Sequence, residues 1–174
     1  MLNDFNLLAT TYRGSEEDLC SEIWYLLREI GDETAQVEKT GIKGLITAKT
    51  ALNPFEAIKK LRDMLKKHPS EFRYALRIIP IETVITTNPE EIKEAVTKLA
   101  LKIGEDETIR VTIEKRFTTH SSKEIIEAAV ANVERKVDLG NPDKSILLEV
   151  IGKLTGISII EPNDIINVTK EKTS

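Results

Sequence analysis

The sequence predicts an α+β protein with two small domains. Three observations favour this fold class. Short apolar stretches typical of strands alternate with stretches that have helical periodicity, glycines and prolines separate them, and Pro80 closes a first complete set of elements. A length of 174 residues suits one large domain or two small ones, and 40% hydrophobic residues permit a real core.

Residues 1–80 are predicted to form the first domain. A helix capped by Ser15, with Asp18 in a capping-box position, should follow the first strand. A second helix should begin at Asn53–Pro54, a cap followed by proline at the first helical position. The order β-α-β-β-α-β is that of the ferredoxin-like fold, with two helices on one face of an antiparallel sheet. Strands are expected at Phe5–Tyr12, Ala35–Lys39, Leu45–Lys49 and Phe72–Ile79.

Residues 81–168 are predicted to form a second, α/β domain. Ile81–Thr87 is expected to be an extended link, and a helix should begin at Asn88–Pro89. A helix capped by Ser121 or Ser122 should follow the first strand, which gives the order α-β-α-β-β. The polar residues 169–174 are expected to form a flexible tail. The strands are predicted at Thr108–Glu114, where Ile109, Val111 and Ile113 share one face, and at Ser145–Ile151 and Thr155–Ile160.

Composition excludes several classes of protein. No stretch approaches the roughly 20 apolar residues that span a bilayer, so no membrane association is expected. Cys20 is the only cysteine, which rules out an internal disulfide and a cysteine metal cluster. Met1 is not followed by a basic region and an apolar run, so we expect no secretory signal and a cytoplasmic location. Nothing indicates a coiled coil, so no oligomeric state is favoured.

The net charge of −4 does not exclude a nucleic-acid ligand, because phosphate contact depends on local charge. Between residues 110 and 123 the only acidic side chain is Glu114. A strand there delivers two adjacent cations at its end, and a helix with serine caps then begins. Free N–H groups at a helix start bind phosphate. The alternative is that these charges solvate a turn and pair with Glu114 and Glu124. The candidate RNA-binding residues are Lys115, Arg116, His120, Ser121, Ser122 and Lys123.

A second candidate stretch runs from Arg135 to Asp143. It mixes cations with a turn-forming Asn-Pro-Asp, and by itself it is more typical of a connector between a helix and a strand. The further candidate RNA-binding residues are Arg135, Lys136 and Asn141 from this stretch, and Lys153 between the last two strands.

Residues 81–168 resemble the THUMP domain. The resemblance rests on Lys115-Arg116, Ser122, Lys136–Leu139 with Asn141–Asp143, Leu148–Val150 and Gly156–Ser158, and on the spacing between them. The whole chain resembles the stand-alone THUMP proteins that assist tRNA cytidine acetylation, through Phe5–Thr10, Asn53–Phe55 and Phe72–Pro80. That resemblance implies an adaptor that binds tRNA, commonly at its acceptor end, and presents it to a separate acetyltransferase for acetylcytidine formation.

No catalytic residue, cofactor or metal is expected. Gly41–Gly44 and Gly104–Asp106 are too isolated for a phosphate-binding motif, and a Cys-His-Glu zinc deaminase set is missing. We therefore expect a protein that is not itself an enzyme. Two alternatives stay open: a small RNA-modifying enzyme in its own right, and a ferredoxin-like module that senses a small molecule.

Overall fold

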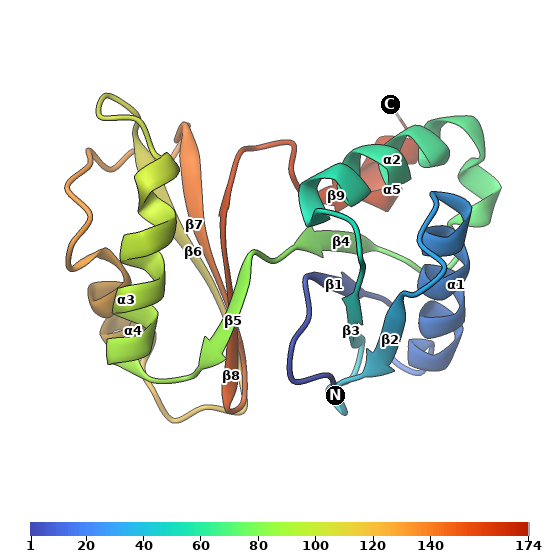
Figure 1. The fold of residues 1–174 in the computed structure, drawn as a ribbon, viewed down its shortest axis with the longest axis horizontal. Coiled ribbons are helices and arrows are strands. Elements are labelled where there is room, and N and C mark those ends of the chain that lie inside the picture. The colour runs from blue at the N-terminus through green and yellow to red at the C-terminus, as the bar shows by residue number, and fades with distance from the viewer. Residues whose placement is uncertain (174) are drawn as a thin grey trace. The chain divides into compact units, whose positions relative to one another are not determined.

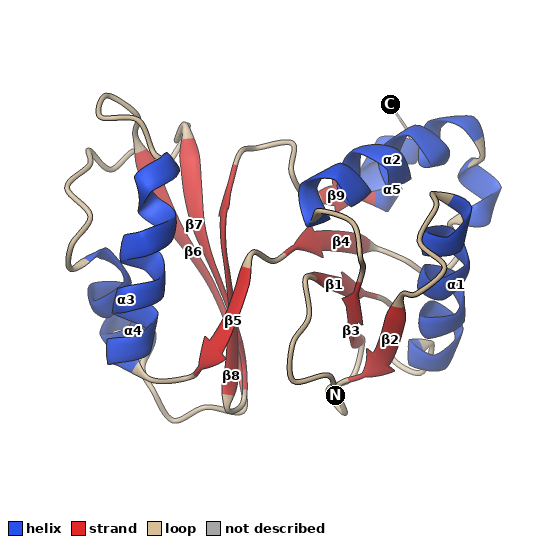
Figure 2. Ribbon diagram, in the orientation of Figure 1, coloured by secondary structure: helices blue, strands red, loops and turns tan. Residues whose placement is uncertain are grey.

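The computed structural model describes residues 1–173; Ser174, the last residue of the predicted tail, lies outside the described part. Its architecture is mixed α and β, as predicted, with two separate sheets (Figures 1 and 2). The chain divides into two compact units. Unit 1 comprises Met1–Ile81 and the C-terminal residues from Asp164 onward, and unit 2 comprises Glu82–Asn163.

Unit 1 is built on a five-stranded sheet with the strand order β2-β3-β1-β4-β9. Every neighbouring pair in it is antiparallel. The order β-α-β-β-α-β predicted for the N-terminal part is the order of its main elements. These elements are β1 (Leu7–Thr10), α1 (Glu16–Glu29), β2 (Gln36–Lys39), β3 (Leu45–Lys49), α2 (Pro54–Lys67), the 3-10 helix η1 (Pro69–Glu71), β4 (Arg77–Pro80), β9 (Ile166–Asn167) and α5 (Val168–Lys172).

The core of unit 1 lies between this sheet and its helices. Alternate strand residues contribute one side of it, as the two-residue period of a strand requires, and the apolar stripes of α1 and α2 contribute the other. Each fully buried leucine or isoleucine contributes about 1.5–3 kcal/mol to folding. The buried residues include Leu7, Ala9, Leu19, Ile23, Leu26, Leu27, Ile46, Ile58, Leu61 and Ile78.

One predicted helix cap in unit 1 is confirmed and the other is wrong. Asn53 caps α2, because its side chain accepts hydrogen bonds from the backbone N–H groups of Phe55 and Glu56 at 2.9 and 3.3 Å. Ser15 stands at the N-cap position of α1, but its side chain makes no capping bond. Its backbone (φ −101°, ψ 17°) is not in the extended conformation from which a cap side chain reaches back into the first turn.

The fourth strand begins at Arg77 rather than at the predicted Phe72. The carboxylate of Glu22, buried on α1, explains the difference. It accepts hydrogen bonds from the backbone N–H groups of Arg73, Tyr74 and Ala75 at 2.7–3.1 Å. These three N–H groups donate to a side chain and therefore do not donate to a neighbouring strand, so the strand begins only after them.

The structure differs from the predicted limits 81–168 at their C-terminal end, and it has a helix where a flexible tail was predicted at 169–174. Ile166 pairs with Ile78 at the edge of the unit 1 sheet, and α5 follows directly. Val168 is buried, and Glu171 forms an ion pair with Arg62 of α2 at 2.6 Å. The C-terminal residues therefore belong to the core of unit 1.

Unit 2 has a four-stranded sheet with the order β5-β8-β7-β6, in which only β6 and β7 are parallel. The expected link Ile81–Thr87 is largely a strand, because Thr83–Thr86 pairs along β8 and forms an edge of the sheet. The order of the second half is therefore β-α-β-α-β-β. The elements are β5 (Thr83–Thr86), α3 (Pro89–Leu99), the 3-10 helix η2 (Ala100–Lys102), β6 (Ile109–Arg116), α4 (Ser122–Val130), β7 (Lys144–Ile151) and β8 (Leu154–Ile160).

Helices α3 and α4 cover one face of this sheet (Figure 2). Asn88 caps α3 as predicted, by accepting from the N–H groups of Glu90 and Glu91. The predicted alternation of β6 is also present, since its odd-numbered residues from 109 to 113 pack toward the helices. The core consists of Ile92, Val96, Ile109, Ile125, Ala129, Ile146, Leu148, Val150, Ile157 and Ile159.

Asp32 makes the stability of unit 1 depend on pH. Its carboxylate joins the end of α1 to the end of β3 by accepting from Thr34, from the Thr50 hydroxyl at 2.6 Å and from the Ala51 N–H at 2.8 Å. Burial raises the pKa of Asp32, but these hydrogen bonds outweigh it, and the pKa lies below its usual value. The stabilisation is therefore present in full above the unfolded-state pKa of about 3.9 and is lost as pH falls through the lower folded-state pKa.

We predict that Asp32→Asn lowers the free energy of unfolding of unit 1 by about 1–3 kcal/mol at pH 7, because an amide cannot accept all of these bonds. The difference from wild type should shrink in acid. Trp24 is the only tryptophan and lies in α1, so its fluorescence during urea unfolding reports unit 1. Asp63→Asn, on the exposed face of α2, is the control. An Asp32→Asn protein that loses stability in parallel with wild type down to low pH contradicts this role.

Candidate nucleic-acid interface

Most of the predicted RNA-binding residues meet at one end of unit 2, where β6 and β7 finish. The carbonyl oxygen of Arg116 accepts a hydrogen bond from the N–H of Gly152 at 2.7 Å, which joins the end of β6 to the β7–β8 turn carrying Lys153. The Lys115 ammonium donates to the carbonyl oxygen of His120 at 3.3 Å, which joins the strand to the start of α4. We call this region the basic end; it comprises Lys115–Lys123 and Lys153.

Helix α4 supplies backbone donors to the basic end. Ser121 is its N-cap, as predicted, and accepts from the N–H of Glu124 at 3.1 Å; Ser122 is the first helical residue. Within residues 1–173, the N–H groups of Ser122 and Lys123 have no partner. The Lys123 side chain is 85% exposed beside them. Free donors, the positive end of a helix dipole and a cation together suit an anionic oxygen.

Arg116 is held inside the protein. Its guanidinium forms an ion pair at 2.7 Å with the carboxylate of Glu149 on the neighbouring strand β7. The Glu149 side chain is 1% exposed and that of Arg116 is 21% exposed. A buried carboxylate needs such a partner, so the first task of Arg116 is to compensate Glu149. The exposed cations of the basic end are therefore the three lysines.

The alternative expectation, that these charges pair with nearby acids, holds in part. His120 lies 3.2 Å from a carboxylate oxygen of Glu124, one helical turn away, and Lys123 lies 4.0 Å from Glu127. Both pairs are exposed, and surface pairs of this kind contribute only about 0–1 kcal/mol. Such weak pairing leaves the Lys123 ammonium available to bind a phosphate group.

The second predicted stretch lies at the opposite end of β6. The N–H of Ile109, the first residue of β6, donates to the carbonyl oxygen of Lys136 at 2.9 Å. Arg135 donates to the carbonyl oxygens of Gly104 and Ile103 at 2.8 and 3.0 Å. The backbone N–H of Asn141 donates to Asp138 at 2.9 Å. These contacts are those of a connector.

The structure therefore separates the predicted site into two groups. An eight-residue strand extends over roughly 23 Å. Arg135, Lys136 and Asn141 lie at the start of β6, and Lys115 and Arg116 lie at its finish. One phosphate group cannot contact both.

Phe117 is a residue of the basic end that the sequence analysis did not single out. Its side chain is 81% exposed, and its backbone adopts φ +56°. The left-handed region is an outlier for a bulky residue and costs about 1–3 kcal/mol. The one signal in the sequence was an aromatic residue directly after two cations, in a segment that has no other apolar side chain up to Lys123.

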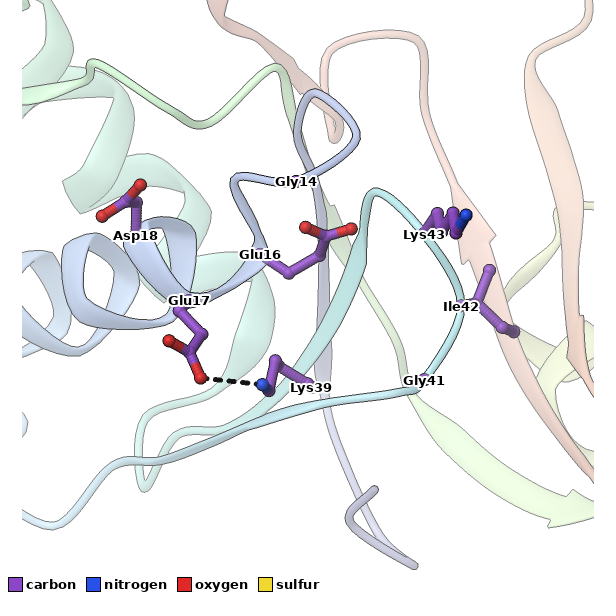
Figure 3. Close-up of a pocket in the computed structure, with 8 residues that line it drawn as sticks. All are labelled: Gly14, Glu16, Glu17, Asp18, Lys39, Gly41, Ile42 and Lys43. Carbon is purple, nitrogen blue, oxygen red and sulfur yellow. Dashed lines mark hydrogen bonds and ion pairs between the residues drawn. The ribbon is translucent and has the colours of Figure 1, made fainter.

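A pocket of about 540 Å³ lies in unit 1, between the start of α1 and the β2–β3 turn (Figure 3). Its charges are largely matched. Glu17 accepts a hydrogen bond from Lys39 at 2.8 Å, which lowers the pKa of Glu17, and the hydrogen bond from the Gly44 N–H lowers the pKa of Glu16. Three successive carboxylates at its rim, those of Glu16, Glu17 and Asp18, disfavour a phosphate ligand.

Within residues 1–173, no group of three or more histidine, cysteine, aspartate or glutamate side chains is arranged to hold a metal ion. No helix in that part of the chain has the length and apolar character needed to cross a bilayer.

Comparison with known families identifies unit 2. Residues 86–160 match the THUMP domain, so the chain carries a THUMP domain, as the sequence resemblance implied. The basic end falls within these residues.

The chain is also homologous to THUMP domain-containing protein 1. It is 25% identical to the mouse protein over 156 residues, which is 78% of this chain and 45% of that protein. It is 24% identical to the human protein, again over 78% of this chain. The chain thus spans less than half of the length of these relatives.

Solved structures share the fold at low sequence identity. TrmN from Thermus thermophilus has a TM-score of 0.55 at 20% identity, with 90% of this chain and 46% of that chain covered. PH1313 from Pyrococcus horikoshii has a TM-score of 0.58 at 18% identity, with 90% and 55% covered. A 4-thiouridine synthetase in complex with RNA and ATP has a TM-score of 0.51 at 20% identity, with 90% and 42% covered.

The ion pair between Arg116 and Glu149 should stabilise unit 2. Arg116→Ala should lower the free energy of unfolding of unit 2 by about 3 kcal/mol, the low end of the range for a broken buried pair, because the guanidinium is partly exposed. Lys115→Ala, at an exposed position, should change it by less than about 0.5 kcal/mol. Hydrogen exchange of the β6 and β7 amides measures the effect in unit 2.

The matched control replaces both partners. Arg116→Met combined with Glu149→Leu removes both charges of the ion pair and should recover most of the lost stability. If the single Arg116→Ala variant exchanges as slowly as wild type, the ion pair does not hold the end of β6.

Proposed function

We propose that this protein is a tRNA-binding adaptor that presents its tRNA to a separate acetyltransferase for acetylcytidine formation. One observation carries the RNA-binding part: within a THUMP domain, an RNA-binding module, the basic end combines three exposed lysines with the free N–H groups at the start of α4. The support from the comparisons is the homology to THUMP domain-containing protein 1 and the similar fold of a 4-thiouridine synthetase that has been solved with RNA.

The chemistry of the basic end suits a phosphate backbone. Lysine ammonium groups and helix N-terminal N–H groups contact phosphate oxygens and carry no information about base identity. Most of the free energy of such contacts comes from the release of counterions, which acts locally. An acidic protein with a net charge of −4 can therefore still bind RNA through one basic region.

We further assign unit 1 to the ferredoxin-like class. The support is its β-α-β-β-α-β order and its antiparallel strand order β2-β3-β1-β4. In our proposal unit 1 orients the bound tRNA by contacting its acceptor end. It also contacts the acetyltransferase through the outer face of α1. There Trp24 is 46% exposed, and the Arg28 guanidinium lies 5.0 Å from the centre of its ring. The cytoplasmic location expected from the sequence stays a prediction.

The first test measures tRNA binding against salt concentration. Combined replacement of Lys115, Lys123 and Lys153 by alanine should weaken binding to all tRNAs alike. The slope of log K against log salt should fall by about one to three units, according to how many phosphates the lysines contact. Arg116 stays in place because its loss would disturb folding.

The control has the same change in net charge elsewhere. Lys60, Lys66 and Lys67 lie exposed on α2, and their combined replacement by alanine should leave both the affinity and the slope close to wild type. Equal losses in the two triple variants would mean that total charge, and not the basic end, binds tRNA.

The second test addresses the adaptor role. With purified acetyltransferase, tRNA, ATP and acetyl-CoA, addition of this protein at sub-saturating tRNA should raise tRNA acetylation, because a shared platform raises the local concentration of tRNA at the enzyme. The triple variant of the basic end should not. The protein with acetyl-CoA alone should leave the mass of tRNA unchanged. If it acetylates tRNA without the partner enzyme, or fails to stimulate that enzyme, the adaptor role is refuted.

A further inference from the structure

Phe117 is an exposed aromatic side chain that the phosphate contacts of the basic end do not use. It follows Arg116 at the end of β6, and its side chain is 81% exposed. A ring that stays exposed to water to this extent contributes little to folding.

The backbone holds Phe117 in this position from both sides. On the N-terminal side, Arg116 is fixed by its ion pair with Glu149 and by the hydrogen bond from the Gly152 N–H. On the C-terminal side, the N–H of His120 donates to the Thr118 hydroxyl at 3.2 Å. A phenylalanine kept at φ +56° by contacts of this kind is a strained residue, and such residues cluster where ligands bind.

The geometry points to Phe117 as a stacking platform for one unpaired base of the bound RNA. This inference rests on the proposed function, since the phosphate of the same or the next nucleotide is taken to lie at the lysines and the start of α4. An aromatic ring beside a cationic phosphate site is the combination that single-stranded nucleic acid requires, because every base has a face that stacks and a phosphate that needs a counter-charge.

A stacking platform selects a class of RNA that the phosphate site alone does not select. Bases inside a blunt duplex are already stacked and paired, so they are not available to Phe117. An unpaired end, or a loop whose bases are not stacked on one another, offers a free base. The protein should therefore prefer RNA with an unpaired end over a blunt duplex of the same charge.

The test uses the full chain and two RNA hairpins that share one stem and the same stable tetraloop, whose bases stack on one another; one hairpin has an unpaired 3′ extension and the other is blunt. Phe117→Ala should weaken binding to the extended hairpin by about 5- to 100-fold and leave the blunt hairpin unchanged. The salt slope should stay at the wild-type value, because no cation is lost. Phe117→Trp should retain the preference, and a 2-aminopurine base in the extension should be quenched by wild type but not by Phe117→Ala.

Phe117→Gly separates stacking from folding. Glycine accepts a positive φ without strain, so this variant should be at least as stable as wild type while it loses the preference for the extended hairpin. Its loss of binding therefore cannot come from unfolding.

The outcomes separate this inference from the proposed function. If wild type binds neither hairpin, the proposed function fails. If wild type binds and the lysine triple variant does not, yet Phe117→Ala matches wild type on both hairpins, stacking is overturned and phosphate binding stands. Equal losses on both hairpins, or a loss only of acetyltransferase binding, would make Phe117 a general or protein contact and would also overturn it.

Discussion

A carboxylate buried within the unit 2 sheet has to be balanced by a cation, and Arg116 balances Glu149 at 2.7 Å. Much of the basic end depends on this pairing. It fixes the last residue of β6, and with it the strained turn at Phe117 and the entry into α4. The same interaction removes Arg116 from the set of free cations. A residue that looks in the sequence like an RNA contact thereby becomes the support for its neighbours.

Several features of the fold could be predicted because they depend on nearby residues. The Asn-Pro caps of α2 and α3 and the Ser121 cap of α4 need only the first helical turn, and the alternation in β6 needs only one strand. Features that depend on distant partners could not be predicted. Strand β9 has two residues and forms only because β4 offers an edge. The carboxylate of Glu22 accepts a hydrogen bond from the backbone N–H of Ala75, which lies 53 residues further along the sequence.

The candidate site shows the same division. The prediction of a phosphate site at Lys115–Lys123 rested on a strand end, two cations and a capped helix, and the structure brings these parts together. The sequence analysis treated Arg135, Lys136 and Asn141 as a second stretch of the same candidate site, but it did not show that they lie at the opposite end of β6. It did not mark Phe117 either, because a positive φ on a phenylalanine is imposed by contacts and not by its own preference.

The central claim is that tRNA phosphate binds the start of α4 at the basic end. Backbone amide shifts measured by NMR during a tRNA titration test it most directly, because the N–H groups of Ser122 and Lys123 are the proposed donors. The account predicts that these two amides and their neighbours from Lys115 onward shift most, and that Lys136 and Asn141 at the other end of β6 stay in place. Shifts concentrated at Arg135–Asp143, or at the pocket in unit 1, with Ser122 and Lys123 unmoved, would contradict it.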